Sequence, residues 1–156
     1  MKKRYIKYAS LFSVVFVLIS CSSAQVEVDP FETSRTYLSD YDTQWKKMVR
    51  FFSTNAISIG TLERESGIIT VNSLNLNPQT IGEYCLYTVP FLQNLSGGSI
   101  TGSATLVEDD EFVTANVNFS MNVTFSSCNM YGQCFYSTQS CVSNGSLEKS
   151  LLDALN

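Results

Sequence analysis

The chain contains no histidine among its 156 residues. Without an imidazole, the Ser-His and Cys-His nucleophile pairs, the histidine zinc motifs and the usual general base near neutral pH are excluded. Glycine motifs that bind phosphate are also missing. A hydrolase using two carboxylates stays formally open, but Glu63, Glu65 and Glu83 have no spacing that favours one. We therefore predict a protein that is not an enzyme, with no catalytic residue and no cofactor.

A hydrophobic run long enough for a transmembrane helix is lacking as well. The apolar stretch from Leu11 to Ile19 follows a basic segment that reaches Lys7. A membrane-spanning helix needs about 20 apolar residues, whereas the core of a secretory signal has about 7–15. The N-terminus is therefore typical of an export signal rather than of a membrane span.

The residues Leu18-Ile19-Ser20-Cys21 that end this stretch resemble the lipobox of bacterial lipoproteins. The resemblance implies that residues 1–20 are removed and that Cys21 becomes the lipid-bearing N-terminus, with enough acyl chains for stable anchoring. The alternative is an ordinary signal peptide cut after Ala24. Because no Asp follows Cys21, the analogy with enteric lipoproteins favours the outer membrane of the cell envelope.

The mature chain has little positive charge. Removing residues 1–20 leaves six basic and fourteen acidic residues, a net charge of −8. Such a surface repels phosphate backbones, so a nucleic-acid partner is disfavoured. Attachment to a membrane must then come from the lipid on Cys21 rather than from a basic patch.

Four cysteines remain besides Cys21, an even number that predicts two disulfides in an exported chain. Three connectivities are open. The short, glycine-containing spacing favours Cys128–Cys134, which leaves Cys85–Cys141. We predict structural disulfides here, and no metal site, since the acidic tetrad 108–111 is better explained as a solvated hairpin tip than as a cation site.

Periodicity predicts one α+β domain over residues 37–156, after a tether over residues 21–36. An amphipathic helix capped by Ser39 or Asp40 comes first, and a second helix begins at about Ser146. Between them the apolar period changes to two, most clearly over Val113–Phe125. We expect a two-layer fold: an antiparallel sheet of five or six strands, with the N-terminal and C-terminal helices packed on one face.

Shorter segments predict the remaining elements. A hairpin turns at residues 65–67, and a further strand spans about residues 83–89. Residues 95–98 are expected to be a flexible link, a strand to follow over 99–107, and a short edge strand to lie at 135–138.

The segment Cys141-Val142-Ser143-Asn144-Gly145-Ser146-Leu147-Glu148 resembles a terminal motif of a group of uncharacterised bacterial lipoproteins. The order of a tryptophan-bearing helix, a hairpin with Glu-Ser-Gly at its turn, further strands and a closing helix is similar to the helix-grip domain of BamC-like lipoproteins. Those proteins are accessory parts of outer-membrane β-barrel assembly. The resemblance implies a non-catalytic interaction or accessory module with an envelope protein as partner. The alternative is a carrier or sensor of a small apolar ligand held between helix and sheet.

Overall fold

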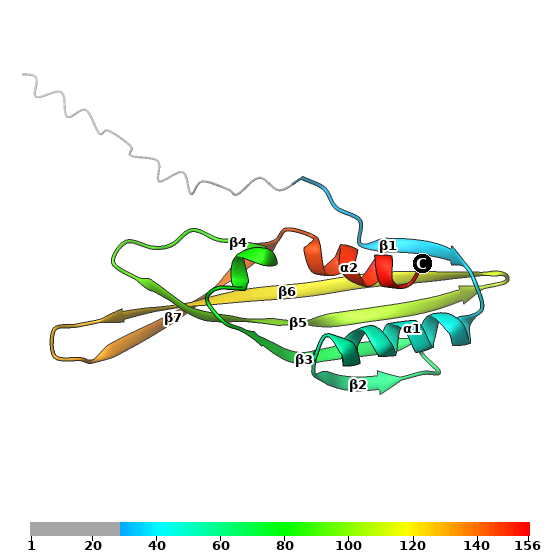
Figure 1. The fold of residues 1–156 in the computed structure, drawn as a ribbon, viewed down its shortest axis with the longest axis horizontal. Helices are drawn as coiled ribbons and strands as arrows, with labels where there is room; N and C mark the ends of the chain where they lie inside the picture. The colour runs from blue at the N-terminus through cyan, green and yellow to red at the C-terminus, as the bar shows by residue number, and fades with distance from the viewer. Residues whose placement is uncertain (1–28) are drawn as a thin grey trace, which may run out of the picture.

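The computed structural model describes residues 29–156, in which a short strand precedes the first helix and six further strands separate it from the second (Figure 1). The elements in chain order are β1 (Ser34–Leu38), α1 (Tyr41–Thr54), β2 (Ile59–Glu63), β3 (Ile68–Leu76), η1 (Ile81–Glu83), β4 (Cys85–Leu86), β5 (Asn94–Asp109), β6 (Phe112–Cys128), β7 (Cys134–Ser143) and α2 (Ser146–Ala154). The α+β class and both α-helices are confirmed.

All the strand pairs are antiparallel, as predicted, in the order β2-β3-β5-β6-β7-β4. β5 and β6 form a long hairpin of 16 and 17 residues. On its other edge β6 is shared, since β1 pairs with its first residues, from Phe112 to Asn116, and β7 pairs with its last, from Met121 to Cys128. The sheet therefore has seven strands, and the prediction of five or six was wrong.

The helix α1 begins where the sequence indicates. The Asp40 carboxylate accepts a hydrogen bond from the Thr43 N–H at 2.8 Å, and hydrogen bonds from Thr43 hold the pKa of Asp40 below its ordinary value. Apolar side chains of α1 lie in the core, with Met48 and Phe52 fully inaccessible and Trp45 7% exposed. The single tryptophan is therefore a core residue.

The alternation along β6 has the expected consequence. Seven side chains, at every second position from Val113 to Phe125, are each at most 8% exposed. The residues between them face away from the core. One face of this strand is thus wet and the other lies in the core, as strict alternation predicts.

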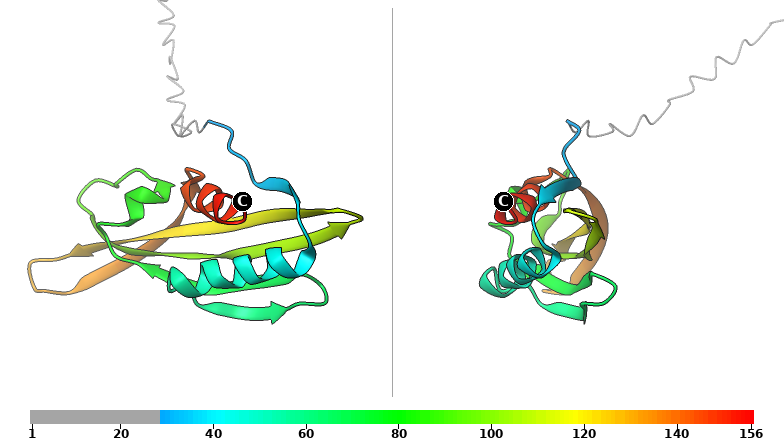
Figure 2. Two further views of the ribbon diagram at one scale, coloured as in Figure 1. Left: turned by 45° about the vertical axis from the view of Figure 1, so that its right-hand side comes forward. Right: turned by 90° about the vertical axis from the view of Figure 1, so that its right-hand side faces the viewer.

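Both helices lie on the same, concave side of the curved sheet (Figure 2). They contact each other through Lys47, whose Nζ donates to the carbonyl oxygens of Leu155 and Asn156 at 2.9 and 2.8 Å. The space between helices and sheet is filled by a single cluster of side chains, including Phe52, Ile100 and Leu151.

Four predicted segments differ from the structure. The short edge strand expected at 135–138 is part of the ten-residue β7, which pairs with both β6 and β4. Residues 34–36, assigned to the tether, belong to β1. The expected strand over 83–89 is reduced to the two residues of β4, and the expected link at 95–98 lies inside β5. In these last three cases the local pattern is weak, because β1 and β4 are short and residues 96–98 are Ser-Gly-Gly. Pairing with β6, β7 and β3 decides these conformations.

Candidate functional site

The predicted lipidation residue Cys21 lies outside the described residues. The other four site cysteines are paired as the spacing favours. Cys85–Cys141 joins β4 to β7 across 56 residues, with Cα atoms 5.9 Å apart, and Cys128–Cys134 joins the ends of β6 and β7. The first disulfide is buried beside the core, since Cys85 is 2% exposed, whereas the second closes an exposed hairpin turn.

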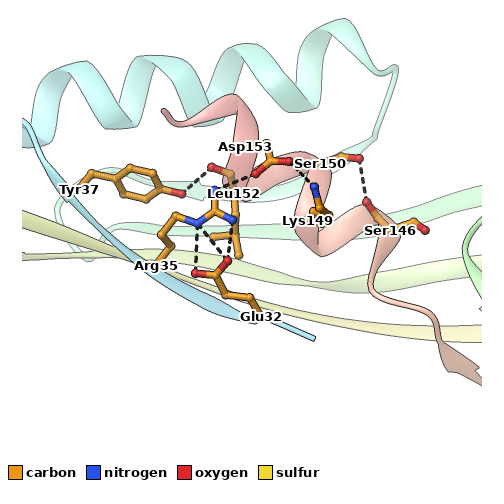
Figure 3. A network of polar contacts seen from close by, with 8 residues as sticks. All are labelled: Glu32, Arg35, Tyr37, Ser146, Lys149, Ser150, Leu152 and Asp153. Atoms are coloured by element: carbon orange, nitrogen blue, oxygen red, sulfur yellow. Dashed lines mark hydrogen bonds and ion pairs between the residues drawn. The ribbon is translucent and has the colours of Figure 1, made fainter. Parts of the chain in front are cut away.

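Charged side chains gather around the helices and the β2–β3 and β5–β6 turns. In one network, Arg35 on β1 joins the N-terminal segment to α2 (Figure 3). Its Nε donates to Glu32 at 3.0 Å and its Nη1 to Asp153 at 2.8 Å. Lys149 also pairs with Asp153, at 3.0 Å.

The hydrogen bonds of this network lower the pKa values of its two carboxyl groups. The hydrogen bond from Arg35 lowers the pKa of Glu32, and the hydrogen bonds from Arg35 and Lys149 lower that of Asp153. Tyr37 lies beside them and donates its hydroxyl to the Leu152 carbonyl at 2.6 Å. Burial raises the pKa of Tyr37 to about 12. These groups hold β1 against α2 and are already paired with one another, so the network is structural.

Arg35→Gln is expected to flatten the acid dependence of stability. A carboxyl whose pKa is lowered on folding contributes stability above its unfolded pKa, and the contribution is lost as pH falls through the folded pKa. The wild-type melting temperature should therefore fall on acidification below about pH 4, the ordinary carboxyl range, and the variant should fall less steeply. The effect is small, because exposed ion pairs are screened by water. Thermal unfolding followed by circular dichroism over this pH range measures both slopes, and equal slopes would contradict the expectation.

No charged residue occurs between residues 84 and 107 or between residues 112 and 147. These stretches meet at one end of the sheet, formed by the β6–β7 turn with its flanking residues (128–136) and the loop 87–93, which we call the uncharged end (Figure 1). The loop is held there by Ser137, whose hydroxyl hydrogen-bonds to the Gln93 side chain at 3.1 Å, and by Tyr87, whose ring packs against Phe125.

The uncharged end exposes large apolar side chains. Met130 is 91% exposed, Phe91 90% and Tyr131 84%. The others are Leu92, Phe135, Tyr136 and Val89, each more than half exposed. Single exposed apolar residues are ordinary, but several at one end of a domain make that end a candidate interaction surface.

A hollow of about 620 Å³ lies away from this end, between the start of α1 and the β2–β3 turn. The Tyr41 hydroxyl there donates to the Arg64 carbonyl, and the Arg64 guanidinium pairs with Asp42. Within residues 29–156 no group of three or more side chains is placed to hold a metal ion, and no helix of this part is of a length and hydropathy that would span a membrane.

No family model matches the chain, and neither does any curated protein at the level of sequence. The candidate site therefore rests on the geometry of the uncharged end. The cysteine spacing predicts only a disulfide loop over residues 128–134, and the exposure of the apolar side chains around it was not predicted. A signal was present: 36 consecutive residues without a charge, containing a turn whose central residues are methionine and tyrosine.

Proposed function

We propose that the protein is a lipid-anchored, non-catalytic interaction module of the bacterial cell envelope, and that it makes its contacts through the uncharged end. The observation that carries the proposal is the cluster of exposed aromatic and aliphatic side chains on the part of the domain that has no charge. The rest of the mature chain carries a net charge of −8, which keeps other faces from associating non-specifically.

Several features support this proposal over the alternative of an apolar-ligand carrier. The region between helix and sheet, where such a ligand would lie, is occupied by the chain's own side chains, with Met48, Phe52 and Leu151 at 0% exposure. A ligand could enter only by displacing them, and interiors are packed too closely to admit one without repacking. The layout of two helices against a curved antiparallel sheet supports the similarity to the helix-grip domain of BamC-like lipoproteins, and with it an accessory role at the outer membrane.

Photocrosslinking tests which end makes the contacts. A photoreactive amino acid at Tyr136, on the uncharged end, should form specific products in intact bacterial envelopes. The matched control is the same amino acid at Phe112, which is also aromatic and exposed but lies at the opposite end of β6. Products of equal yield from both positions, or from neither, would contradict the proposal.

The anchor is tested separately by Cys21→Ala. Since the mature chain is acidic and Cys21 is its lipid acceptor in this proposal, the variant should no longer partition stably with membranes but should stay folded. Fractionation by ultracentrifugation with a circular dichroism spectrum of the released chain checks both points. A variant that stays firmly in the membrane pellet under high salt and mild alkali would exclude Cys21 as the main anchor.

A further inference from the structure

Asn129 organises the β6–β7 turn by pairing with several of its backbone polar groups. The side-chain oxygen of Asn129 accepts hydrogen bonds from the N–H groups of Tyr131 and Gln133, both at 3.0 Å. Asn129 donates its own N–H to the Gln133 carbonyl at 2.9 Å, and Gly132 donates to the Asn129 carbonyl at 3.0 Å. The Asn129 amide group also donates to the Gln133 side chain at 3.0 Å.

This pairing lowers the cost of leaving bulk water for four N–H groups of the turn, while the N–H of Met130 and the carbonyls of Met130 and Tyr131 have no partner within the described residues and must stay hydrated. Unpaired backbone groups cost several kcal/mol each in hydrocarbon, where water cannot replace a missing partner. The side chains that point outward from this turn, Met130 and Tyr131, are apolar or amphipathic and almost fully exposed.

The surroundings of the turn fit a bilayer interface. Phe135 and Tyr136 follow on β7, 66% and 68% exposed, and aromatic side chains of this kind are enriched where hydrocarbon meets headgroups. No charge lies within ten residues of Met130 in either direction, so insertion desolvates none. The Cys128–Cys134 disulfide closes the turn, so little conformational freedom is lost on binding.

The depth of such a contact is limited by the ribbon behind the turn. Beyond the β5 pairing of Ser126, the strands β6 and β7 pair only with each other in the described structure, and a two-stranded ribbon has two open edges that need water. The side chains of the turn can therefore reach the upper acyl region, while the backbone of the turn and of the ribbon stays among the headgroups.

The chain between Cys21 and the domain is long enough for the lipid on Cys21 and the β6–β7 turn to lie in the same bilayer. Phe31 rests against Gly145 at the start of α2, where an added Cβ would lie 2.4 Å from its ring. From there β7, ten residues long, runs about 34 Å to the turn at about 3.4 Å per residue. Cys21 precedes Phe31 by ten residues, which can reach at most about 35 Å.

We propose that the β6–β7 turn inserts Met130 and Tyr131 into the interface of the same bilayer that holds the Cys21 lipid. The domain is then held at two points, and this inference rests on the proposed function while naming a lipid surface as the partner of the uncharged end. The contact is driven by apolar burial and not by charge, because the inserted segment carries none.

The test places a tryptophan at the turn. Full chain carrying Tyr131→Trp, purified from membranes of a bacterial host, is reconstituted into phosphatidylcholine vesicles with or without brominated acyl chains. Emission of the new tryptophan should shift to the blue, and it should be quenched more by bromine near the headgroup than near the chain end. The native Trp45, buried in the core, provides the unquenched background, and Phe112→Trp at the opposite end of β6 is the matched control.

A second variant measures the contribution of the turn to binding. Without its lipid, the Cys21→Ala chain should bind vesicles only weakly and reversibly, through the turn. In that chain, Met130→Ser with Tyr131→Ser should weaken vesicle flotation about tenfold or more, since two apolar side chains lose their burial. Added salt should not weaken the binding of the parent chain, and replacing part of the phosphatidylcholine by anionic phosphatidylglycerol should not strengthen it. Equal melting temperatures of the two chains show that folding is unchanged.

The outcomes separate the two proposals. Quenching of Tyr131→Trp but not of Phe112→Trp supports the bilayer contact. If Tyr131→Trp is not quenched in protein-free vesicles while Tyr136 crosslinks to a protein in intact envelopes, the lipid assignment is overturned and the interaction module stands. If Tyr131→Trp is not quenched and the photoreactive group at Tyr136 forms no specific product, both proposals are overturned.

Discussion

Phe52→Ala is expected to lower the free energy of unfolding by about 3–5 kcal/mol, the usual cost of truncating a buried aromatic ring. Phe52 is 0% exposed and lies in the cluster that joins α1 to the sheet. Removing its ring leaves a cavity that the neighbouring side chains cannot fill, since they come from elements held in place by the sheet and by α2. Urea unfolding followed by circular dichroism measures the change.

The control for this prediction is the same substitution at an exposed site. Phe91→Ala, at a ring that is 90% exposed, should change the free energy of unfolding by no more than about 0.5 kcal/mol, as is usual for surface positions. A loss at Phe91 comparable to the loss at Phe52 would show that the loop 87–93 is part of the core, and it would contradict our assignment of Phe91 to an interaction surface.

The second large effect is expected from the disulfide between β4 and β7. Removing it with Cys85→Ala and Cys141→Ala should cost about 4 kcal/mol in the chain-entropy account, because the bond closes a 56-residue separation. For a domain of this size the melting temperature should fall by about 10–20 °C. The alanine pair avoids leaving a free thiol in the core. Differential scanning calorimetry of the oxidised chains gives the comparison.

The other disulfide provides a matched control for the same chemistry. Cys128→Ala with Cys134→Ala opens a separation of only six residues at an exposed turn, so the expected cost is about 2 kcal/mol. If both double variants melt at the same temperature, the large loop closed by Cys85–Cys141 does not stabilise the domain in the way proposed. The Cys128–Cys134 variant should instead weaken vesicle binding, because the turn is then less well ordered before insertion.

The parts of the fold that could be predicted are those with long, regular patterns. The helix α1 has an Asp40 cap and apolar residues repeating over three turns, and β6 alternates over more than twelve residues. Long patterns of this kind match the period of one secondary structure only, and in β6 a shift of one residue would expose every apolar side chain. The cysteine pairing followed from spacing, since Cys128 and Cys134 are close enough in sequence to meet across one turn.

The parts that could not be predicted depend on partners distant in the chain. β1 is five residues long and exists because Ser34–Leu38 pairs with the first residues of β6. Gly97 and Gly98 indicate a flexible link, yet they lie in β5, paired with Thr124 and Val123 of β6. A short or glycine-containing segment has little preference of its own, so the neighbouring strand decides its conformation.

The features of the candidate site also fall into those that the sequence predicts and those that depend on the tertiary structure. The sequence by itself determined the predicted anchor at Cys21, the acidic mature chain and the absence of histidine chemistry, because each depends only on which residues are present and on short spacings. Only the tertiary structure decided that the two charge-free stretches meet at one end of the sheet. It also decided that Met130 and Tyr131 face outward there while the apolar residues of β6 face the core. Exposure is a property of packing. The residue type of a methionine does not say whether it is buried, because the packing of the sheet and helices determines which methionine side chains are covered.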